Sequence, residues 1–351
     1  MKTPLFGHRP SALAAVAALL AVLATAKADA IHYPFTGLVF GLAVAPDDSL
    51  LATDTGAGIF EIRRGALSQV AVLPGVTAVD PIGRGDMFAI TSREFGGEGK
   101  LYRVSRGSTR EIADLYDFEI RVNPDGNPVA PPPAPGPSNP FDVEALNGGS
   151  VLVADAAGNS LLIVDQRGNI DWIATLPNEV VSTANGQKIF GCPQAGPPPV
   201  CNNSMLPAQG VATSVAVGPD GAYYVGELKG IPAPKGESRV WRIEPGTRHA
   251  VCGTSPACRI VADGFTSIVD LTFGPGGTLY VVELDEESWL AMQMGKGTGG
   301  SVNACNSTTW VCTQVATGLP MVSSVAVGRD GTVHIVTGAV NPLAVDIGTL
   351  P

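Results

Sequence analysis

Two carboxylates and two hydroxyls occupy the same position in successive copies of an internal repeat. They are Asp142, Ser214, Asp270 and Ser324, and a fifth copy has Gly41 there. Each begins an apolar segment that is followed by a tight turn, so a ring of such units brings all of these residues to one axis. Converging oxygen atoms are the ligands that Ca²⁺ prefers. A metal site at Asp142 and Asp270 is therefore one prediction, with Ca²⁺ as the candidate ion.

The same groups also fit a second interpretation, in which they hydrogen-bond backbone amides and ordered water around a narrow channel. Asn139, Thr213 and Ser323 lie just upstream in three copies and add further oxygen atoms to either arrangement. The candidates for binding in the channel are Asp142, Ser214, Asp270, Ser324 and Asn139.

A second set of equivalent positions follows the second strand of each copy. Side-chain acceptors there can cap the turn into the third strand, as Asp and Thr do in local turns. Glu227 and Glu283 fit this role less well because the loops after them are long, so we expect them to face the channel mouth. The six positions are Asp54, Thr91, Asp155, Glu227, Glu283 and Thr337.

The repeat itself predicts the fold. Residues 215–225, 271–282 and 325–336 each show an apolar strand, a Gly-containing tight turn and a second apolar strand, and the first and third of these turns also contain Asp. Copies recur at roughly fifty-residue spacing, which indicates a ring of small antiparallel sheets. We predict an all-β, six-bladed β-propeller with first strands near Gly41, Val79, Phe141, Ser214, Asp270 and Ser324.

The ring needs a strand from the N-terminus to close it. The last copy lacks an outer strand after residues 343–347, and residues 32–39 form a spare strand before the first copy. Pairing them removes the exposed sheet edges. Residues 115–138 leave room for a seventh blade. Their prolines at 131–133, 135 and 137 favour an extended loop, since proline supplies no ladder N–H.

Residues 1–30 have the pattern of a secretory signal peptide, with a basic start, an apolar run and small residues at the end. Cleavage after Ala28 also fits, and a membrane anchor is the alternative. Residues 31–351 are then a single exported propeller domain with no membrane span, in the periplasm or outside the cell. The formal net charge of −10 argues against nucleic acid as a partner.

The six cysteines fall into three close pairs, which in an exported chain indicates disulfides between sequence neighbours. A metal site is the alternative, but no pair has the Cys-x-x-Cys spacing. Each bridge closes a short loop and contributes roughly 2 to 3 kcal/mol in the chain-entropy description. The pairs are Cys192 with Cys201, Cys252 with Cys258, and Cys305 with Cys312.

Several segments resemble motifs of the ScyD/ScyE family of exported, NHL-like propeller proteins, named for a pigment cluster. The tracts are residues 123–126, 138–143, 154–159, 226–232, 265–271 and 279–283, and the resemblance extends over essentially the whole mature chain. It implies a secreted β-propeller with NHL-like repeats rather than a particular reaction. The function it implies is a scaffold that binds a small molecule or a protein and is accessory to secondary-metabolite chemistry.

An enzyme remains the alternative. The chain resembles calcium-dependent, six-bladed lactonases and esterases in architecture, and an oxidative-coupling enzyme would also use the central channel. Those lactonases place metal ligands immediately before a Gly-apolar pair on the inner strands. The corresponding residues here are Phe40, Phe141, Thr213, Val269 and Ser323, which lack the carboxylates and amides of that set. No catalytic residue is assigned.

Overall fold

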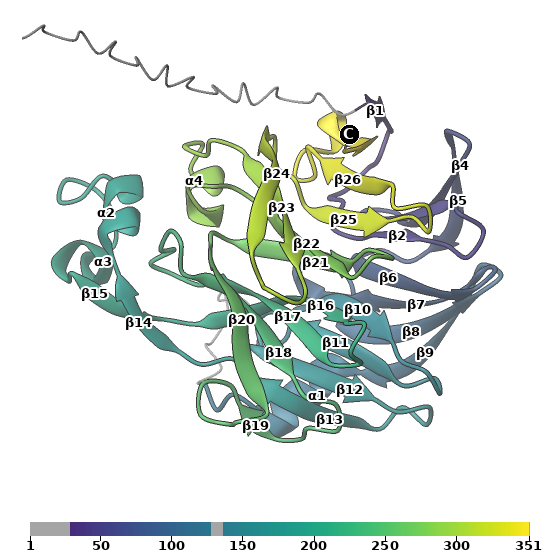
Figure 1. Cartoon of the computed structure of the whole chain (residues 1–351), viewed down its shortest axis with the longest axis horizontal. Coiled ribbons are helices and arrows are strands. Elements are labelled where there is room, and N and C mark those ends of the chain that lie inside the picture. The colour runs from purple at the N-terminus through teal and green to yellow at the C-terminus, as the bar shows by residue number, and fades with distance from the viewer. Residues whose placement is uncertain (1–28, 128–135, 351) are drawn as a thin grey trace, which may run out of the picture.

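The computed structural model describes residues 29–127 and 136–350. Six sheets surround one axis as the blades of a propeller, which confirms the predicted all-β fold (Figure 1). Most of the predicted leader and proline run lie outside the described residues. No helix in the described part is long and apolar enough to cross a membrane.

Strands within each of the first three blades are antiparallel and run outward from the axis in sequence order. They are β2 (Leu42–Val44), β3 (Leu50–Asp54), β4 (Gly58–Arg63) and β5 (Ala66–Val72) in blade 1; β6 (Val76–Gly83), β7 (Asp86–Thr91), β8 (Lys100–Ser105) and β9 (Ser108–Asp114) in blade 2; and β10 (Pro140–Ala145), β11 (Val151–Asp155), β12 (Ser160–Val164) and β13 (Ile170–Thr175) in blade 3.

The other three blades have the same order, except that the outer strand of the last one comes from the N-terminus. They are β16 (Gly210–Val217), β17 (Tyr223–Lys229), β18 (Ser238–Ile243) and β20 (Cys258–Phe265) in blade 4; β21 (Ile268–Phe273), β22 (Thr278–Glu283), β23 (Gly300–Asn306) and β24 (Cys312–Leu319) in blade 5; and β25 (Ser324–Val327), β26 (Val333–Thr337), β27 (Asp346–Thr349) and β1 (Asp29–His32) in blade 6. A short strand, β19 (Ala250–Val251), pairs in parallel with β13.

The turn residues explain why the inner hairpins form. Between β25 and β26, the carboxylate of Asp330 accepts a hydrogen bond from the amide of Thr332 at 2.9 Å. Gly331 follows with a φ of +87°, a conformation that favours glycine. Between β16 and β17, the carboxylate of Asp220 likewise accepts from the amide of Ala222, and Gly221 has a φ of +77°. These Asp-Gly turns hold the two innermost strands in register.

Apolar residues fill the space between neighbouring blades. Trp241 of β18, only 1% exposed, belongs to a cluster that also contains Leu161 of β12 and Val225 of β17. Similar clusters lie between the other blades. The core is therefore divided among the blade interfaces, as expected for units that bury their faces against neighbours.

The N-terminal strand closes the ring, but with other residues than the sequence predicts. β1 pairs with β27 through residues 29–32 opposite residues 346–349, and the two strands lie side by side at the top of Figure 1. The predicted strand 32–39 is wrong except for His32. Tyr33, Phe35 and Val39 alternate like a strand, but they are buried in the cluster between blades 6 and 1.

β1 also bears on the predicted leader. The strand begins at Asp29, so cleavage after residue 30 would remove its first two residues. Cleavage after Ala28, the second site that the sequence offers, would leave β1 whole.

The segment after β9 contains a helix that the sequence analysis missed. α1 (Leu115–Val122) begins after Asp114, whose side chain accepts a hydrogen bond from the amide of Asp117 at 2.8 Å. Leu115 and Phe118 are on its buried face. The described residues 115–127 thus add no strand to a seventh blade.

A disulfide-bearing excursion projects from the side of the propeller between blades 3 and 4 (Figure 1). This lobe, residues 179–208, has a hairpin of β14 (Glu179–Ser182) and β15 (Met205–Ala208) with two short helices, α2 (Ala184–Phe190) and α3 (Pro198–Asn202). It packs against α4 (Trp289–Gln293), with Ile189, Leu290 and Ala291 in one buried cluster.

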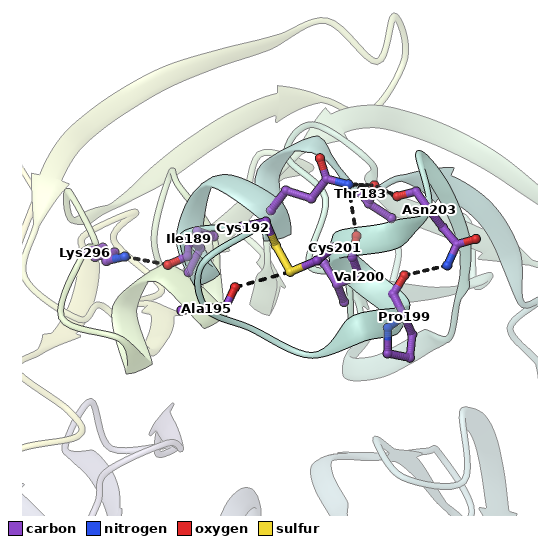
Figure 2. Close-up of a disulfide and its surroundings, with 10 residues drawn as sticks. Thr183, Ile189, Cys192, Ala195, Pro199, Val200, Cys201, Asn203 and Lys296 are labelled. Carbon is purple, nitrogen blue, oxygen red and sulfur yellow. Dashed lines mark hydrogen bonds between the residues drawn. A yellow bond between two sulfur atoms is a disulfide. The ribbon is translucent and has the colours of Figure 1, made fainter.

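All three predicted disulfides are present, each between sequence neighbours. The bridge from Cys192 to Cys201 closes the loop between α2 and α3, and beside it Lys296 donates to the carbonyl of Ile189 (Figure 2). The other two staple the outer parts of blades 4 and 5, away from the axis.

Closure through β1 generates a stability prediction. A chain that begins at Tyr33 instead of Asp29 loses the β1–β27 ladder and exposes an edge strand. We expect its free energy of unfolding to fall by about 2 to 4 kcal/mol, from a few lost hydrogen bonds. Chemical denaturation of both chains measures this. Equal midpoints would show that β1 does not stabilise the ring.

Candidate functional site

A cavity of about 830 Å³ opens at the end of the channel where the innermost strands begin. Its volume is within the range of ordinary small-molecule sites. Residues before or within the inner strands form its floor, and Trp289 and Met292 of α4 form part of its wall. The disulfide lobe packs on the same helix, so it supports this wall.

The floor is aromatic. Phe40, just before β2, lies with its ring centroid 5.0 Å from that of Phe95 and 5.2 Å from that of Phe141. Phe95 ends a short 3₁₀ helix, η1 (Arg93–Phe95), and Phe141 is in β10. All three rings line the cavity. Aromatic faces at these separations provide a surface on which a flat apolar molecule can pack.

The positions that correspond to the lactonase ligands lie before or within the inner strands. The residues that replace the lactonase ligands all line the cavity, and they are Phe40, Phe141, Thr213, Val269 and Ser323. The place where those enzymes carry metal ligands is therefore largely apolar in this chain.

Below the floor, the channel narrows to a cavity of about 30 Å³. Asp142, Asp270 and Ser324 line it. Ser214 does not line this space; it is fully buried, and its hydroxyl has no hydrogen-bond partner among the described residues. A space of this size has room for about one or two water molecules. Asn139 instead lines the large cavity and accepts from the hydroxyl of Ser92 at 2.6 Å.

The two aspartates join neighbouring blades. Asp142 of blade 3 accepts from the amide of Val215 in blade 4 at 2.7 Å. Asp270 of blade 5 accepts from the amide of Val325 in blade 6 at 2.7 Å, and from the hydroxyl of Ser324 at 2.6 Å. The second oxygen of each carboxylate accepts from the amide of the next residue in its own strand. Both carboxylates thus bind the backbone.

Hydroxyls make the corresponding bonds at the other four blade interfaces. In each case a Thr or Ser side chain donates to a backbone carbonyl of the next blade, and every such hydroxyl is buried. The pairs are Thr53 with Thr77 at 3.1 Å, Thr77 with Pro140 at 2.8 Å, Thr213 with Ile268 at 2.7 Å, and Ser323 with Val39 at 2.7 Å. Together with Asp142 and Asp270 these residues form an axial ring of hydrogen bonds that crosses all six interfaces.

Two further carboxylates lie close enough to Asp142 to interact with its charge, and they were not among the predicted residues. Asp80 of β6 accepts from the amide of Ala145 at 2.6 Å, and Glu144 follows Asp142 by two positions in β10. Since side chains two apart share one face of a strand, the alternation at Asp142 and Glu144 was a usable signal. Asp80 occupies the position in the inner strand of blade 2 that corresponds to Glu144 in blade 3.

Burial sets the ionisation of these four groups. Loss of water raises the pKa of Asp80 to about 6 and that of Asp270 to about 7. Burial and then the charge of Asp270 raise the pKa of Asp142 well above its usual range, and burial followed by Asp80 does so for Glu144. Desolvation and like charges both favour the neutral acid here.

Three members of the second predicted set organise local structure. Asp54 accepts from the amide of Gly56 at 2.8 Å and from that of Thr36 at 2.7 Å. Asp155 accepts from the amides of Asn139, Ala157 and Gly158 and from the hydroxyl of Ser138. The hydroxyl of Thr91 accepts from the amide of Glu98 in the following loop and from that of Lys100, the first residue of β8.

Glu227 and Glu283, which we expected at the channel mouth, are instead buried within their blades and do not line the cavity. Glu227 contacts the ammonium of Lys229 and accepts from the indole N–H of Trp241 at 3.1 Å. Glu283 accepts from the side chains of Ser301 and Asn303 at 2.9 and 2.7 Å. Buried polar partners hold both carboxylates away from the channel, and three of them, Trp241, Ser301 and Asn303, lie on neighbouring strands.

The predicted Ca²⁺ site can be tested against these contacts. In the described part of the chain, no three His, Cys, Asp or Glu side chains are placed to hold one metal ion. The oxygens of Asp142 and Asp270 already accept protein hydrogen bonds, and the adjoining space is small. Ca²⁺ requires six to eight oxygen ligands. These residues do not form such a cage.

Comparison with known proteins supports the fold. No protein-family profile and no curated protein sequence matches the chain. Solved structures do: a putative glucose dehydrogenase-type oxidoreductase of Thermus thermophilus matches with a TM-score of 0.56 at 19% identity, over 93% of this chain and 99% of that one. A gluconolactonase of Xanthomonas campestris matches with a TM-score of 0.54 at 13% identity, over 90% of this chain and 88% of that one.

Virginiamycin B lyase of Staphylococcus aureus gives a TM-score of 0.52 at 14% identity, over 93% of this chain and 85% of that one. The solved neighbours include six-bladed propellers. Identities this low show a shared fold and carry no activity across. The resemblance to the ScyD/ScyE family remains a prediction.

The raised carboxyl pKa values predict how stability depends on pH. A group with a raised pKa in the folded state stabilises the fold below its unfolded pKa, near 4, and loses that contribution as pH rises through its folded pKa. For Asp80 and Asp270 the loss falls between about pH 4 and pH 7. We expect the Asp142→Asn/Asp270→Asn variant to show a smaller fall in unfolding free energy over this window than the unsubstituted chain.

Urea denaturation at several pH values measures the effect. The Asp330→Asn variant is the control, because that exposed carboxylate caps a surface turn and its pKa is lowered by hydrogen bonds from Thr332. An unchanged pH dependence in the double variant would contradict the assignment.

Proposed function

We propose that this protein is an extracytoplasmic β-propeller that binds a small, flat, largely apolar molecule in the cavity at the channel mouth. One observation carries the proposal: the cavity of about 830 Å³ has a floor of three phenylalanine rings where the axis of the propeller opens. Sites of this kind combine an apolar lining with a few polar groups that orient the ligand.

The wall supplies those polar groups and further apolar surface. Trp289 donates its indole N–H to the carbonyl of Lys229 at 2.9 Å, which fixes the ring at the cavity edge. Asn139 and Gln209 line the cavity and offer amide groups. The ligand would therefore pack on aromatic faces and make a small number of directed hydrogen bonds.

The proposed compartment rests on the disulfides and the leader. Three formed disulfides suit an oxidising environment outside the cytoplasm. The leader-like sequence of residues 1–30 supports export. Secretion to the periplasm or cell exterior is part of the proposal.

An accessory role in secondary-metabolite chemistry follows only from the ScyD/ScyE resemblance. The aromatic floor suits phenolic or indolic compounds, which supports such a role without specifying a reaction. We do not extend the proposal to a metal-dependent lactonase or oxidative-coupling enzyme, because the carboxylates expected to hold the metal are bonded to backbone amides.

Binding in the cavity is tested with an indolyl methyl ketone as the probe. We expect isothermal titration calorimetry to show saturable binding, weakened about tenfold or more by Phe141→Ala, through lost aromatic contact. The control is Phe60→Ala, which removes a half-buried ring that packs on Phe35 outside the cavity. Equal effects of both substitutions would contradict binding on the aromatic floor, and no binding of this or any phenolic probe would contradict the proposal.

A further inference from the structure

One carboxyl group at the cavity stands out from the rest of the lining. Glu119 of α1 lines the cavity, yet its side chain is only 1% exposed. It lies on the buried face of the helix, one turn after Leu115 and directly after Phe118. Positions on such a face are normally apolar. A carboxyl group there is not needed to build the helix.

Glu119 has no protein partner that would explain its burial. Its Oε2 atom has no hydrogen-bond partner in the described part of the chain, and no Lys or Arg among the described residues forms an ion pair with it. The only charged pair on α1 is exposed, between Arg121 and Asp117 at 2.8 Å. Burying a polar atom without a partner is costly unless a ligand or solvent supplies one.

Backbone packing leaves room for this carboxyl group. A Cβ atom on Gly158, in the turn after β11, would lie 2.9 Å from Oε2 of Glu119. Any side chain at this position would therefore press on the carboxyl oxygen. The glycine therefore lets the carboxyl group of Glu119 lie close against the turn after β11.

The charged groups that face Glu119 are acidic. The negative charges of Asp155, at the end of β11, and Asp125, after α1, disfavour the ionised form of Glu119. Glu94 of η1 lines the same cavity. Burial first, then Asp155 and Asp125, raises the pKa of Glu119 to about 8. At neutral pH the group is therefore mainly the neutral acid, which carries one O–H donor.

We propose that Glu119 is a ligand-recognition residue that donates a hydrogen bond from its neutral carboxyl group to a carbonyl oxygen of the bound molecule. This rests on the proposed function, since it concerns the ligand of the same cavity. A neutral acceptor fits better than a carboxylate, because Glu94, Asp125 and Asp155 would repel an anion. The ligand class is thus a neutral aromatic ketone, aldehyde or amide whose ring packs on Phe40, Phe95 and Phe141.

Two probes separate recognition of the carbonyl from general apolar binding. The first is the indolyl methyl ketone, and its matched control is the ethylindole of similar size that lacks the oxygen. We expect the ketone to bind wild-type protein about tenfold more tightly at about pH 6 than at about pH 9, because Glu119 ionises between them and loses its donor. Binding of ethylindole should change much less over the same range.

Substitutions at Glu119 distinguish a donor from a structural role. Glu119→Gln retains an N–H donor that does not titrate, so ketone binding should become independent of pH. Glu119→Met keeps the length without a donor and should bind the ketone as weakly as wild type does at high pH. Thermal unfolding of both variants reports whether the fold is intact. Rescue by Gln but not Met is a pattern that a purely structural role would not give.

Infrared difference spectroscopy of wild type against Glu119→Gln provides a readout without any ligand. A protonated-carboxyl band at about pH 6 that disappears on titration through about pH 8 supports the neutral state. Absence of the band would overturn the proposal, as would identical pH profiles of ketone binding in wild type and Glu119→Gln. If the band is present but neither probe binds, the cavity-binding function fails, and the recognition role with it.

Discussion

Hydrogen bonds around the axis hold the six blades to one another, and the remaining features of the molecule depend on them. At four interfaces a Thr or Ser hydroxyl donates to the next blade, and at two interfaces Asp142 or Asp270 accepts from it. These groups are removed from bulk water, so each must find a partner within the protein. Because the ring is closed by β1, every inner strand has such a neighbour on both sides. The axial ring thus satisfies the polar groups of the channel and fixes the relative positions of the blades.

This arrangement explains why the candidate site lies above the channel rather than in it. The carboxylates that could bind a ligand in the narrow part are bonded to backbone amides, and little space remains between them. Just above, the inner strands carry Phe40 and Phe141 at their start, and the cavity widens between the loops of the blades. The disulfide lobe and α4 add Trp289 to one side. Rigid inner strands therefore present an apolar floor, while connecting segments such as α1 supply groups that can discriminate between ligands.

The fold was largely predictable from the sequence because its signals are local and repeated. Tight turns that contain Gly or Asp, flanked by paired apolar segments, recur in each copy, and the neighbouring cysteines pair with each other. The failures involve contacts between distant residues. Apolar and polar residues alternate in 33–39 as in a strand, but their apolar side chains are buried between blades 6 and 1 and the segment does not pair with a neighbouring strand. The carboxylate of Glu227 is directed by Lys229 and Trp241, of which Trp241 is on another strand. Glu119 was missed because its helix lies in a segment whose prolines indicate a loop, and nothing in the local sequence reveals its burial.

The central claim is that the carboxylates of the axial ring serve as links between blades and do not form a metal centre. Elemental mass spectrometry of the disulfide-intact protein tests it most directly, with the Asp142→Ala/Asp270→Ala variant measured beside it. The account predicts metal well below one ion per chain in both proteins, together with a loss of stability in the variant of about 2 kcal/mol or more, from two broken sets of buried hydrogen bonds. One Ca²⁺ or other ion per wild-type chain that disappears in the variant would contradict the account and place a metal centre in the channel.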